Sequence, residues 1–220
     1  QAAGAICGMV RTKVAKDIKD RPIIAASMFG NTTECVEAAK TILEDSGYEV
    51  LVFHATGTGG KTMESLISEG LIAGVLDVTT TEWADELCGG VLSAGSTRLE
   101  AAGKFGVPAI VTPGCLDMVN FGARETVPNQ FEGRNFYVHN PQVTLMRTTP
   151  EEGAQLGRIL AEKVNAYKCP VTVLLPTKAI SIISASGQPF YDPDADQALF
   201  NAIKVNLSPS IEMIEVDTEI

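Results

Sequence analysis

Residues 54–64 read HATGTGGKTME, and this stretch decides the fold of the chain. An apolar run at 48–53 precedes it and predicts a buried parallel strand, while residues 62–69 carry apolar side chains at helical spacing. A glycine-rich turn between a strand and a helix exposes backbone N–H groups at the positive end of the helix dipole, where anions bind. The stretch therefore predicts a strand–turn–helix unit with an anion site at the turn.

The candidate anion ligands in this turn are Gly57, Thr58, Gly59, Gly60, Lys61 and Thr62. Lys61 offers an ammonium group and the two threonines offer hydroxyl donors. The spacing nearly matches a P-loop, with Ala55 in place of the first glycine. The alternative is a tight turn that needs glycine only for its backbone geometry. We favour anion binding, because a lysine beside a glycine cluster is more than a turn requires.

The composition indicates one large α/β domain and argues against several other classes of protein. The chain has 220 residues, 45% of them hydrophobic, and a net charge of −10 with no basic cluster, so we expect no nucleic-acid surface. No apolar run reaches the ~18 residues that span a membrane. Five scattered cysteines without a C-x-x-C pair indicate a reducing, cytoplasmic location. With only two histidines, we expect no metal site.

Apolar strands alternate with amphipathic helices along most of the chain. This order predicts a three-layer Rossmann-like α/β domain, with a mainly parallel sheet of about six strands and helices on both faces. Residues 21–220 form this lobe in our interpretation, and residues 1–20 are a linker or the end of a preceding lobe. The periodicity fades between 115 and 142, which predicts a lid or a binding loop. The predicted strands are 22–28, 48–53, 71–78, 107–112, 171–175 and 211–216, and the predicted helices are 32–46, 62–69, 83–87, 96–105, 150–167 and 194–205, with 179–183 either helix or strand.

Three further turns follow predicted strands, and the carboxyl ends of parallel strands meet at one edge, where ligands bind. Gly30, Asn31 and Thr32 resemble the phosphate loop of flavodoxins, although Asn31 or Thr32 could equally cap a helix. Gly95 and Arg98 open the helix at 96–105, and Arg98 is either a fork for a phosphate or carboxylate or a surface arginine.

The last turn, at 112–120, brings candidates for chemistry. Asp117 and Asn120 are candidate ribose or base contacts. Cys115 with His139 would permit acyl transfer, although a lone cysteine is more often a small buried hydrophobe. Asp77, at the end of the strand at 71–78, is a candidate Mg²⁺ ligand or, more simply, a strand-end cap.

The order of these segments resembles one protein family. The segments are SMFGNTT (27–33), HATGTGGKTME (54–64), DVTTTE (77–82), AGKFGVP (102–108) and TPGCLDMVNFG (112–122). They are similar to the bacterial, fungal and plant family that includes the tobamovirus-resistance ATP-binding proteins. The resemblance implies a two-lobed ATP-binding protein with Rossmann-like lobes that often forms dimers, and this chain would be its second lobe. In the plant relative the corresponding region restrains a viral replication protein.

The leading hypothesis is a nucleotide-binding lobe of a larger cytosolic protein. ATP, with or without Mg²⁺, would lie on the turn at 57–62 and the neighbouring turn at 30–33, with Lys61 neutralising charge. Two alternatives stay open: an enzyme acting on a small phosphorylated or carboxylated metabolite through Asp117, Cys115 or His139, and an oligomeric interaction scaffold with a vestigial pocket. The expected partners are a small anionic ligand, the preceding lobe and further copies of the chain.

Overall fold

The structure, a computed structural model, describes residues 2–12 and 21–220. The helices are α1 (Ala2–Arg11), α2 (Thr33–Asp45), α3 (Thr58–Ser68), α4 (Glu82–Cys88), α5 (Ala101–Phe105), α6 (Pro150–Asn165) and α7 (Pro193–Asn206). The strands are β1 (Ile23–Met28), β2 (Glu49–His54), β3 (Gly74–Thr79), β4 (Ala109–Gly114), β5 (Met118–Phe121), β6 (Phe136–Asn140), β7 (Val143–Arg147), β8 (Val171–Pro176) and β9 (Glu212–Val216).

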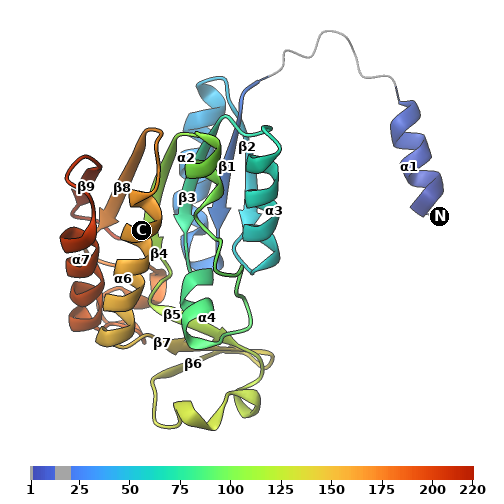
Figure 1. Cartoon of the computed structure of the whole chain (residues 1–220). Coiled ribbons are helices and arrows are strands. Elements are labelled where there is room, and N and C mark those ends of the chain that lie inside the picture. The colour runs from blue at the N-terminus through green and yellow to red at the C-terminus, as the bar shows by residue number, and fades with distance from the viewer. Residues whose placement is uncertain (1, 13–20) are drawn as a thin grey trace.

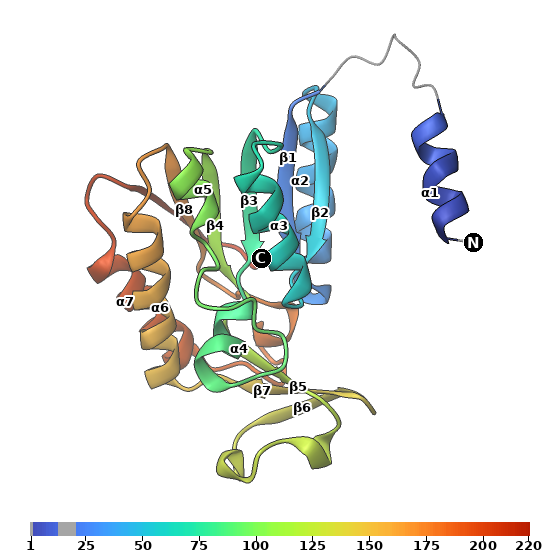
Figure 2. The same cartoon turned by 45° about the vertical axis from the view of Figure 1, so that its right-hand side comes forward.

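The main sheet has six parallel strands in the order β2-β1-β3-β4-β8-β9, which confirms the predicted fold class. The chain first moves outward from β1 to β2, then crosses back to β3 on the other side of β1. The strand order therefore reverses between β1 and β3, and Figures 1 and 2 show the sheet with these strands side by side. Ligands of open parallel sheets bind beyond the carboxyl ends of the strands at such a reversal.

Helices cover the two faces of the sheet unequally. Side chains of α3, α5, α6 and α7 share one large core cluster with the sheet, whereas the cluster on the opposite face contains only α2 among the helices. Beyond α2 the second face is partly bare, with Ile110 and Ile214 each 41% exposed. An apolar groove of about 570 Å³ lies there, between α2 and the starts of β1, β3, β4 and β8.

The segment 115–142 differs from our prediction of a lid or loop. It contributes β5 and β6, which pair on either side of β7 in a separate three-stranded antiparallel sheet. Figure 1 shows this small sheet below the carboxyl ends of the main strands. Strands of only four or five residues, separated by proline and glycine turns, are too short to show periodicity in the sequence.

Two helix starts also differ from the predicted bounds. α3 begins at Thr58 rather than at residue 62, so Gly59, Gly60 and Lys61 lie in its first turn. α5 begins at Ala101 rather than at 96, because Leu99 has a positive φ of 69° that a helix cannot contain. The ambiguous segment 179–183 runs into a short 3₁₀ helix, Ile182–Ser184.

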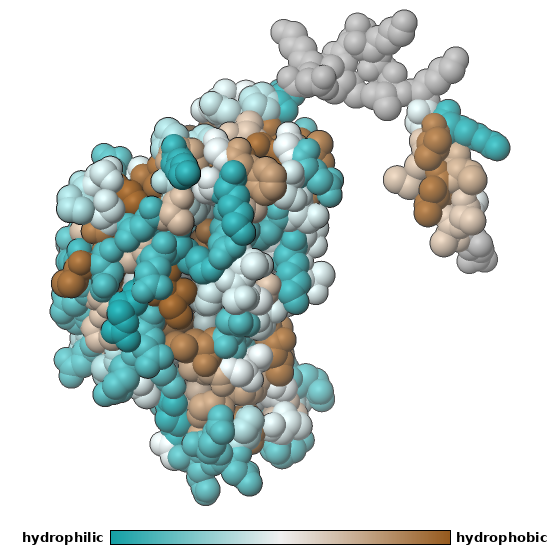
Figure 3. All heavy atoms as spheres, viewed as in Figure 1, coloured by the Kyte–Doolittle hydropathy of each residue, from teal (hydrophilic) through white to brown (hydrophobic). Residues whose placement is uncertain are grey.

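Before the domain, the predicted linker or end of a preceding lobe falls partly on residues 1 and 13–20, which lie outside the described residues. Residues 2–11 form α1, which buries none of its side chains. Figure 3 shows α1 coloured mostly as hydrophobic. In the described part of the chain, no helix combines the length and the apolar character that crossing a membrane requires.

Candidate functional site

The glycine turn after β2 is filled by a carboxylate of the protein itself. The backbone N–H groups of Gly57 and Gly60 donate to Glu82 Oε1 at 2.7 and 3.1 Å. A Cβ atom at Gly60 would lie 2.1 Å from Glu82 Oε2, so the side chain can approach only a glycine. The turn therefore does hold an anion at the start of α3, as its chemistry predicts, but that anion is the side chain of Glu82.

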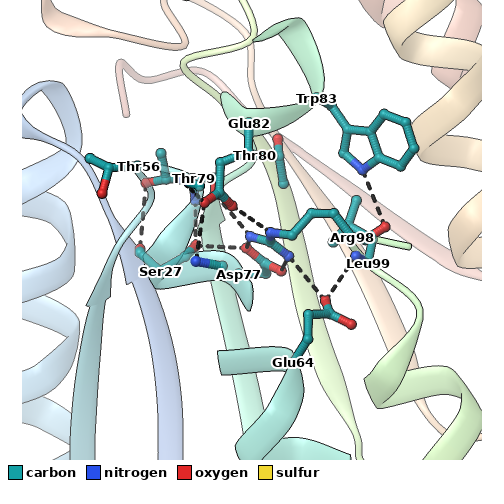
Figure 4. A network of polar contacts seen from close by, with 12 residues as sticks. Ser27, Thr56, Glu64, Asp77, Thr79, Thr80, Glu82, Trp83, Arg98 and Leu99 are labelled. Carbon is teal, nitrogen blue, oxygen red and sulfur yellow. Dashed lines mark hydrogen bonds and ion pairs between the residues drawn. The ribbon is translucent and has the colours of Figure 1, made fainter. Parts of the chain in front are cut away.

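Arg98 neutralises this carboxylate at the centre of a buried network, shown in Figure 4. Only 1% of Arg98 is exposed. Its two terminal nitrogens donate to Asp77 Oδ2 and Oδ1 at 2.5 and 2.6 Å, and its Nε donates to Glu82 at 2.7 Å. Glu64 lies 3.4 Å from the same guanidinium group. Burial alone would lower the pKa of Arg98, but these carboxylates raise it well above its ordinary value.

Arg98 is therefore the predicted fork for a carboxylate, but the carboxylates belong to its own chain. Asp77 is occupied as well, because Ser27 Oγ donates to it at 2.6 Å in addition to Arg98. Both of its oxygens are therefore committed, which leaves no support for Asp77 as a Mg²⁺ ligand. Glu64 accepts the N–H groups of Leu99 and Ala101 and thereby fixes the irregular chain before α5.

A cavity of about 510 Å³ lies beyond the carboxyl ends of β1 and β2, next to the point where the strand order reverses. The small antiparallel sheet forms its opposite wall, and we call this cavity the cleft. Its lining is Phe29, Gly30, Asn31, His54, Thr56, Leu92, Asn120, Tyr137, His139, Asn140, Val143, Leu145 and Ile183. Segments far apart in the sequence thus meet at the edge of the sheet where ligands bind.

The cleft combines rings and neutral polar groups. Phe29 lies against the imidazole of His54, with ring centroids 5.4 Å apart, and Tyr137 lies beside His139 at 6.4 Å. The described residues of the lining include three asparagines and one threonine but no Lys, Arg, Asp or Glu. The cleft is therefore suited to a neutral, flat and hydrogen-bonding part of a ligand.

Asn120 connects the cleft to a buried acid. Its Nδ2 donates to Asp85 Oδ2 at 2.7 Å, while its Oδ1 is buried and receives no hydrogen bond from the described residues. Burial raises the pKa of Asp85 to about 7, although the N–H groups of Asn120 and Leu92 act in the opposite direction. A buried acceptor without a donor is costly, so Asn120 Oδ1 is a polar group that a ligand could satisfy.

The other two candidates from the turn after β4 are enclosed in the protein. Asp117 is fully buried and accepts a hydrogen bond from Ser181 Oγ at 2.7 Å. Burial raises its pKa, with Arg147 acting in the opposite direction. Cys115 is also fully buried, and burial raises the pKa of its thiol well above the ordinary value. An inaccessible thiol that resists ionisation is a poor nucleophile, so Cys115 has the alternative role of a buried hydrophobe.

Residues 21–220 match the C-terminal domain of the Uncharacterised protein family UPF0261. The chain belongs to this family. It is 51% identical over 220 residues to a UPF0261 protein of Clostridium tetani, covering all of this chain and 54% of that protein. It is 43% identical over 206 residues to the ToMV resistance protein Tm-1(GCR237) of Solanum lycopersicum, covering 93% of this chain and 27% of the tomato protein. The chain thus spans about half the length of its bacterial relative.

Among solved structures, the UPF0261 domain is remotely similar to a Mycobacterium smegmatis protein in complex with β-D-fucofuranose. The two are 15% identical, with a TM-score of 0.31, over 90% of this chain and 55% of that one. A TM-score this low carries no information about the ligand of the UPF0261 domain.

The structure distributes the remaining predicted site residues of the UPF0261 domain over different environments. Gly30 and Asn31 line the cleft, whereas Thr32 turns inward and contacts Thr79 Oγ1 at 2.7 Å. Thr58, Lys61 and Thr62 are exposed on the first turns of α3. Gly59 abuts β2, because a Cβ atom there would lie 1.8 Å from the carbonyl oxygen of His54. Gly95 has a positive φ and donates to Ser93 Oγ, and it does not line the cleft.

Sequence reasoning missed Glu82 as the anion of the glycine turn, and it missed most of the cleft. Glu82 stands 25 residues after Gly57, and nothing in the local pattern connects the two. Tyr137 and Asn140 lie on or at the end of a strand that was not predicted. A usable signal did exist for His54, because it ends β2 and therefore had to lie at the ligand-binding edge of this UPF0261 domain.

Proposed function

We propose that this domain is a nucleotide-binding lobe and that the nucleoside part of the ligand, adenosine in the case of ATP, occupies the cleft. The observation that supports the proposal best is the lining itself: aromatic rings and neutral amides surround a cavity of about 510 Å³ at the strand-order reversal. Rings stack on a base, and amides bond to the edges of the base and to the ribose hydroxyls. Asn120 Oδ1 is a buried acceptor for one such donor.

The phosphates occupy a different place in this proposal from the one expected for a P-loop. Glu82 already uses the N–H groups of Gly57 and Gly60, so a phosphate there would meet a carboxylate. We place the outer phosphates, those farthest from the nucleoside, outside the lining, towards the exposed first turn of α3, where Lys61 and Thr58 face solvent. Lys61 then contributes as an exposed cation, which is a modest contribution to affinity.

The proposal extends to the whole protein only through the resemblance to the tobamovirus-resistance family. This chain covers 54% of its bacterial relative, so a further lobe in the intact protein is part of the proposal. The proposed setting is a cytosolic protein that associates into oligomers. The bare face of the sheet beside α2 offers apolar surface for such contacts.

A second candidate is an enzyme acting on a small phosphorylated or carboxylated metabolite. The observation in its favour is that His54 and His139 line one cavity, where imidazoles could move protons. Cys115 and Asp117, the other residues considered for this chemistry, are enclosed. The candidate therefore depends on the two histidines.

Isothermal titration with ATP and with adenosine tests the nucleotide proposal. Leu92 lines the cleft and its neighbour Val91 is 65% exposed outside the lining, so Leu92→Trp and Val91→Trp form a matched pair. We expect Leu92→Trp to weaken both ligands at least about tenfold by filling the cleft, and Val91→Trp to leave them unchanged. Equal binding by the two variants, or no binding of either ligand to the parent protein, would contradict the proposal.

A further inference from the structure

Both histidines of the chain line the cleft. His54 ends β2 in the main sheet and His139 lies on β6 in the small sheet, 85 positions later in the sequence. Both histidines are exposed to solvent, and each ring lies beside an aromatic neighbour, Phe29 for His54 and Tyr137 for His139. The fold thus places the two imidazoles at one cavity from two separate sheets.

These two imidazoles are also the only groups in the described lining that can carry a positive charge near neutral pH. The other positive groups expected at this edge already have partners. The backbone N–H groups of Gly57 and Gly60 donate to Glu82, and Arg98 is bound to Asp77 and Glu82. An anionic group that enters the cleft therefore finds no permanent cation in the lining. Its charge can be balanced there only by protonated histidine.

We propose that the cleft binds an anionic group, a phosphate or a carboxylate, between His54 and His139, and that the imidazoles take up protons from solvent as the anion binds. The proposal deepens the nucleotide hypothesis and rests on the same cavity. It names the chemistry of the ligand: a neutral, flat portion that contacts the rings and amides, and an anion that contacts the histidines. The bound anion makes the protonated form of each histidine more favourable, and by reciprocity protonation strengthens binding.

The other titratable groups near the cleft do not supply this linkage. Tyr137, beside His139, has no cationic form and so cannot balance the charge of an anion. Asp85, whose pKa burial raises to about 7, does not line the cavity and accepts a hydrogen bond from Asn120 Nδ2, so Asp85→Asn is included to separate its proton from those of the histidines. Lys61, on α3, is outside the lining. Proton uptake on binding an anion is therefore assigned to the two histidines.

The sign of the pH dependence distinguishes this mechanism from titration of the ligand. Affinity for the anion should fall by about tenfold between pH 6 and pH 8 as the histidines lose their protons. A phosphate gains negative charge over the same range, which by itself would strengthen binding as the pH rises. Sulfate stays doubly charged throughout this range, so any change of its affinity with pH comes from groups of the protein.

Proton NMR of the untagged chain tests the proposal directly, because two histidines give two imidazole Cε1–H signals. His54→Gln and His139→Gln assign the signals, and circular dichroism checks that each variant folds. We expect saturating sulfate or ATP to move both titration midpoints upward by about 0.5–1 pH unit, and adenosine to leave them in place. Arg158→Ala, an exposed position on α6, is the control that should not change this response.

The outcomes separate this inference from the nucleotide proposal. If ATP and adenosine bind while neither histidine responds to ATP or sulfate, the inference is overturned and the nucleotide proposal stands. If sulfate moves both midpoints but neither nucleotide nor nucleoside binds, the anion site is supported and the nucleotide proposal fails. If no probe binds, both are overturned.

Discussion

The glycine turn after β2 and the cleft at the ends of β1 and β2 are joined by Ala55 and Thr56, yet they differ in their charged groups. The turn is filled by Glu82, which Arg98 neutralises in a buried network. The cleft has no charged residue in its described lining and leaves Asn120 Oδ1 without a donor. Polar groups that find partners within the chain stabilise the fold, whereas a buried acceptor without a donor beside a cavity is a group that a ligand could satisfy.

The largest expected effect on stability comes from a substitution at the centre of the buried network. Arg98→Met removes the cation that neutralises Asp77 and Glu82 and leaves both carboxylates buried without it. We expect the free energy of unfolding to fall by about 3–5 kcal/mol. Urea denaturation measures this, with Arg158→Met at an exposed site as the control, expected to change stability by less than about 0.5 kcal/mol. A loss below about 1 kcal/mol for Arg98→Met would show that the network is not structural.

A smaller effect on stability distinguishes the glycine turn after β2, which contains Gly60, from the turn after β1, which contains Gly30. Gly60→Ala places a methyl group 2.1 Å from Glu82 Oε2 and forces the carboxylate out of the turn, whereas Gly30 has open space around it. We expect Gly60→Ala to lower the free energy of unfolding by about 1–3 kcal/mol and Gly30→Ala to change it by less than about 0.5 kcal/mol. Thermal and urea unfolding of both variants compare the turns. Equal stability of the two variants would mean that the close contact of Glu82 with Gly60 does not contribute to stability.

The pH dependence of stability reports on the acid behind the cleft. Burial raises the pKa of Asp85 from 3.8 to about 7, so between these values the folded chain binds more protons at this site than the unfolded chain. The contribution of Asp85 to stability is therefore complete at low pH and is lost as the pH rises towards 7. We expect a slope of up to about 1.4 kcal/mol per pH unit in this range, which Asp85→Asn should reduce.

Urea denaturation of the parent and of Asp85→Asn at several values between pH 4.5 and 8 measures this slope. Asp196, whose pKa burial raises to about 6, adds a slope of the same sign, so the difference between the two proteins is the informative quantity. Identical slopes would remove Asp85 from the set of groups that titrate on unfolding.

The smallest effect concerns the residue that the P-loop comparison made prominent. Lys61 is exposed, and the N–H groups beside it serve Glu82, so Lys61→Ala should change stability by less than about 0.5 kcal/mol. We expect it to weaken ATP about two- to fivefold, as an exposed ion pair allows, and to leave adenosine unchanged. Titration calorimetry decides this. Abolished ATP binding would identify the glycine turn as the phosphate site. The turn, and not the cleft, would then be the region open to a ligand.

The parallel sheet could be predicted because its strands are apolar runs bounded by glycine and polar turns, with helices of clear periodicity between them. α6 illustrates this: the local sequence predicts an N-cap followed by Pro150 at the first helical position, and in the structure Thr149 caps the helix and forms a capping box with Glu152. The small antiparallel sheet could not be predicted, because its short strands are stabilised by contacts with β7 and the core rather than by a local pattern.

Only part of the cleft could be predicted from the sequence. Gly30 and Asn31 reach the cleft because they directly follow β1. The role of Arg98 depended on Asp77 and Glu82, which stand 21 and 16 positions earlier in the sequence, and only the fold brings these groups together. Local spacing shows which groups can bind an anion, but it does not show whether the protein supplies that anion.

The contact of Gly59 with the carbonyl of His54 makes the first turn of α3 a spacer for the end of β2. Any side chain at residue 59 would push the end of β2 away from the helix. The backbone of His54, and with it the imidazole, would move. Gly59, which lies outside the cleft lining, thereby fixes the position of the strand end that carries His54. A substitution at residue 59 would therefore shift His54 without changing any residue of the cleft lining.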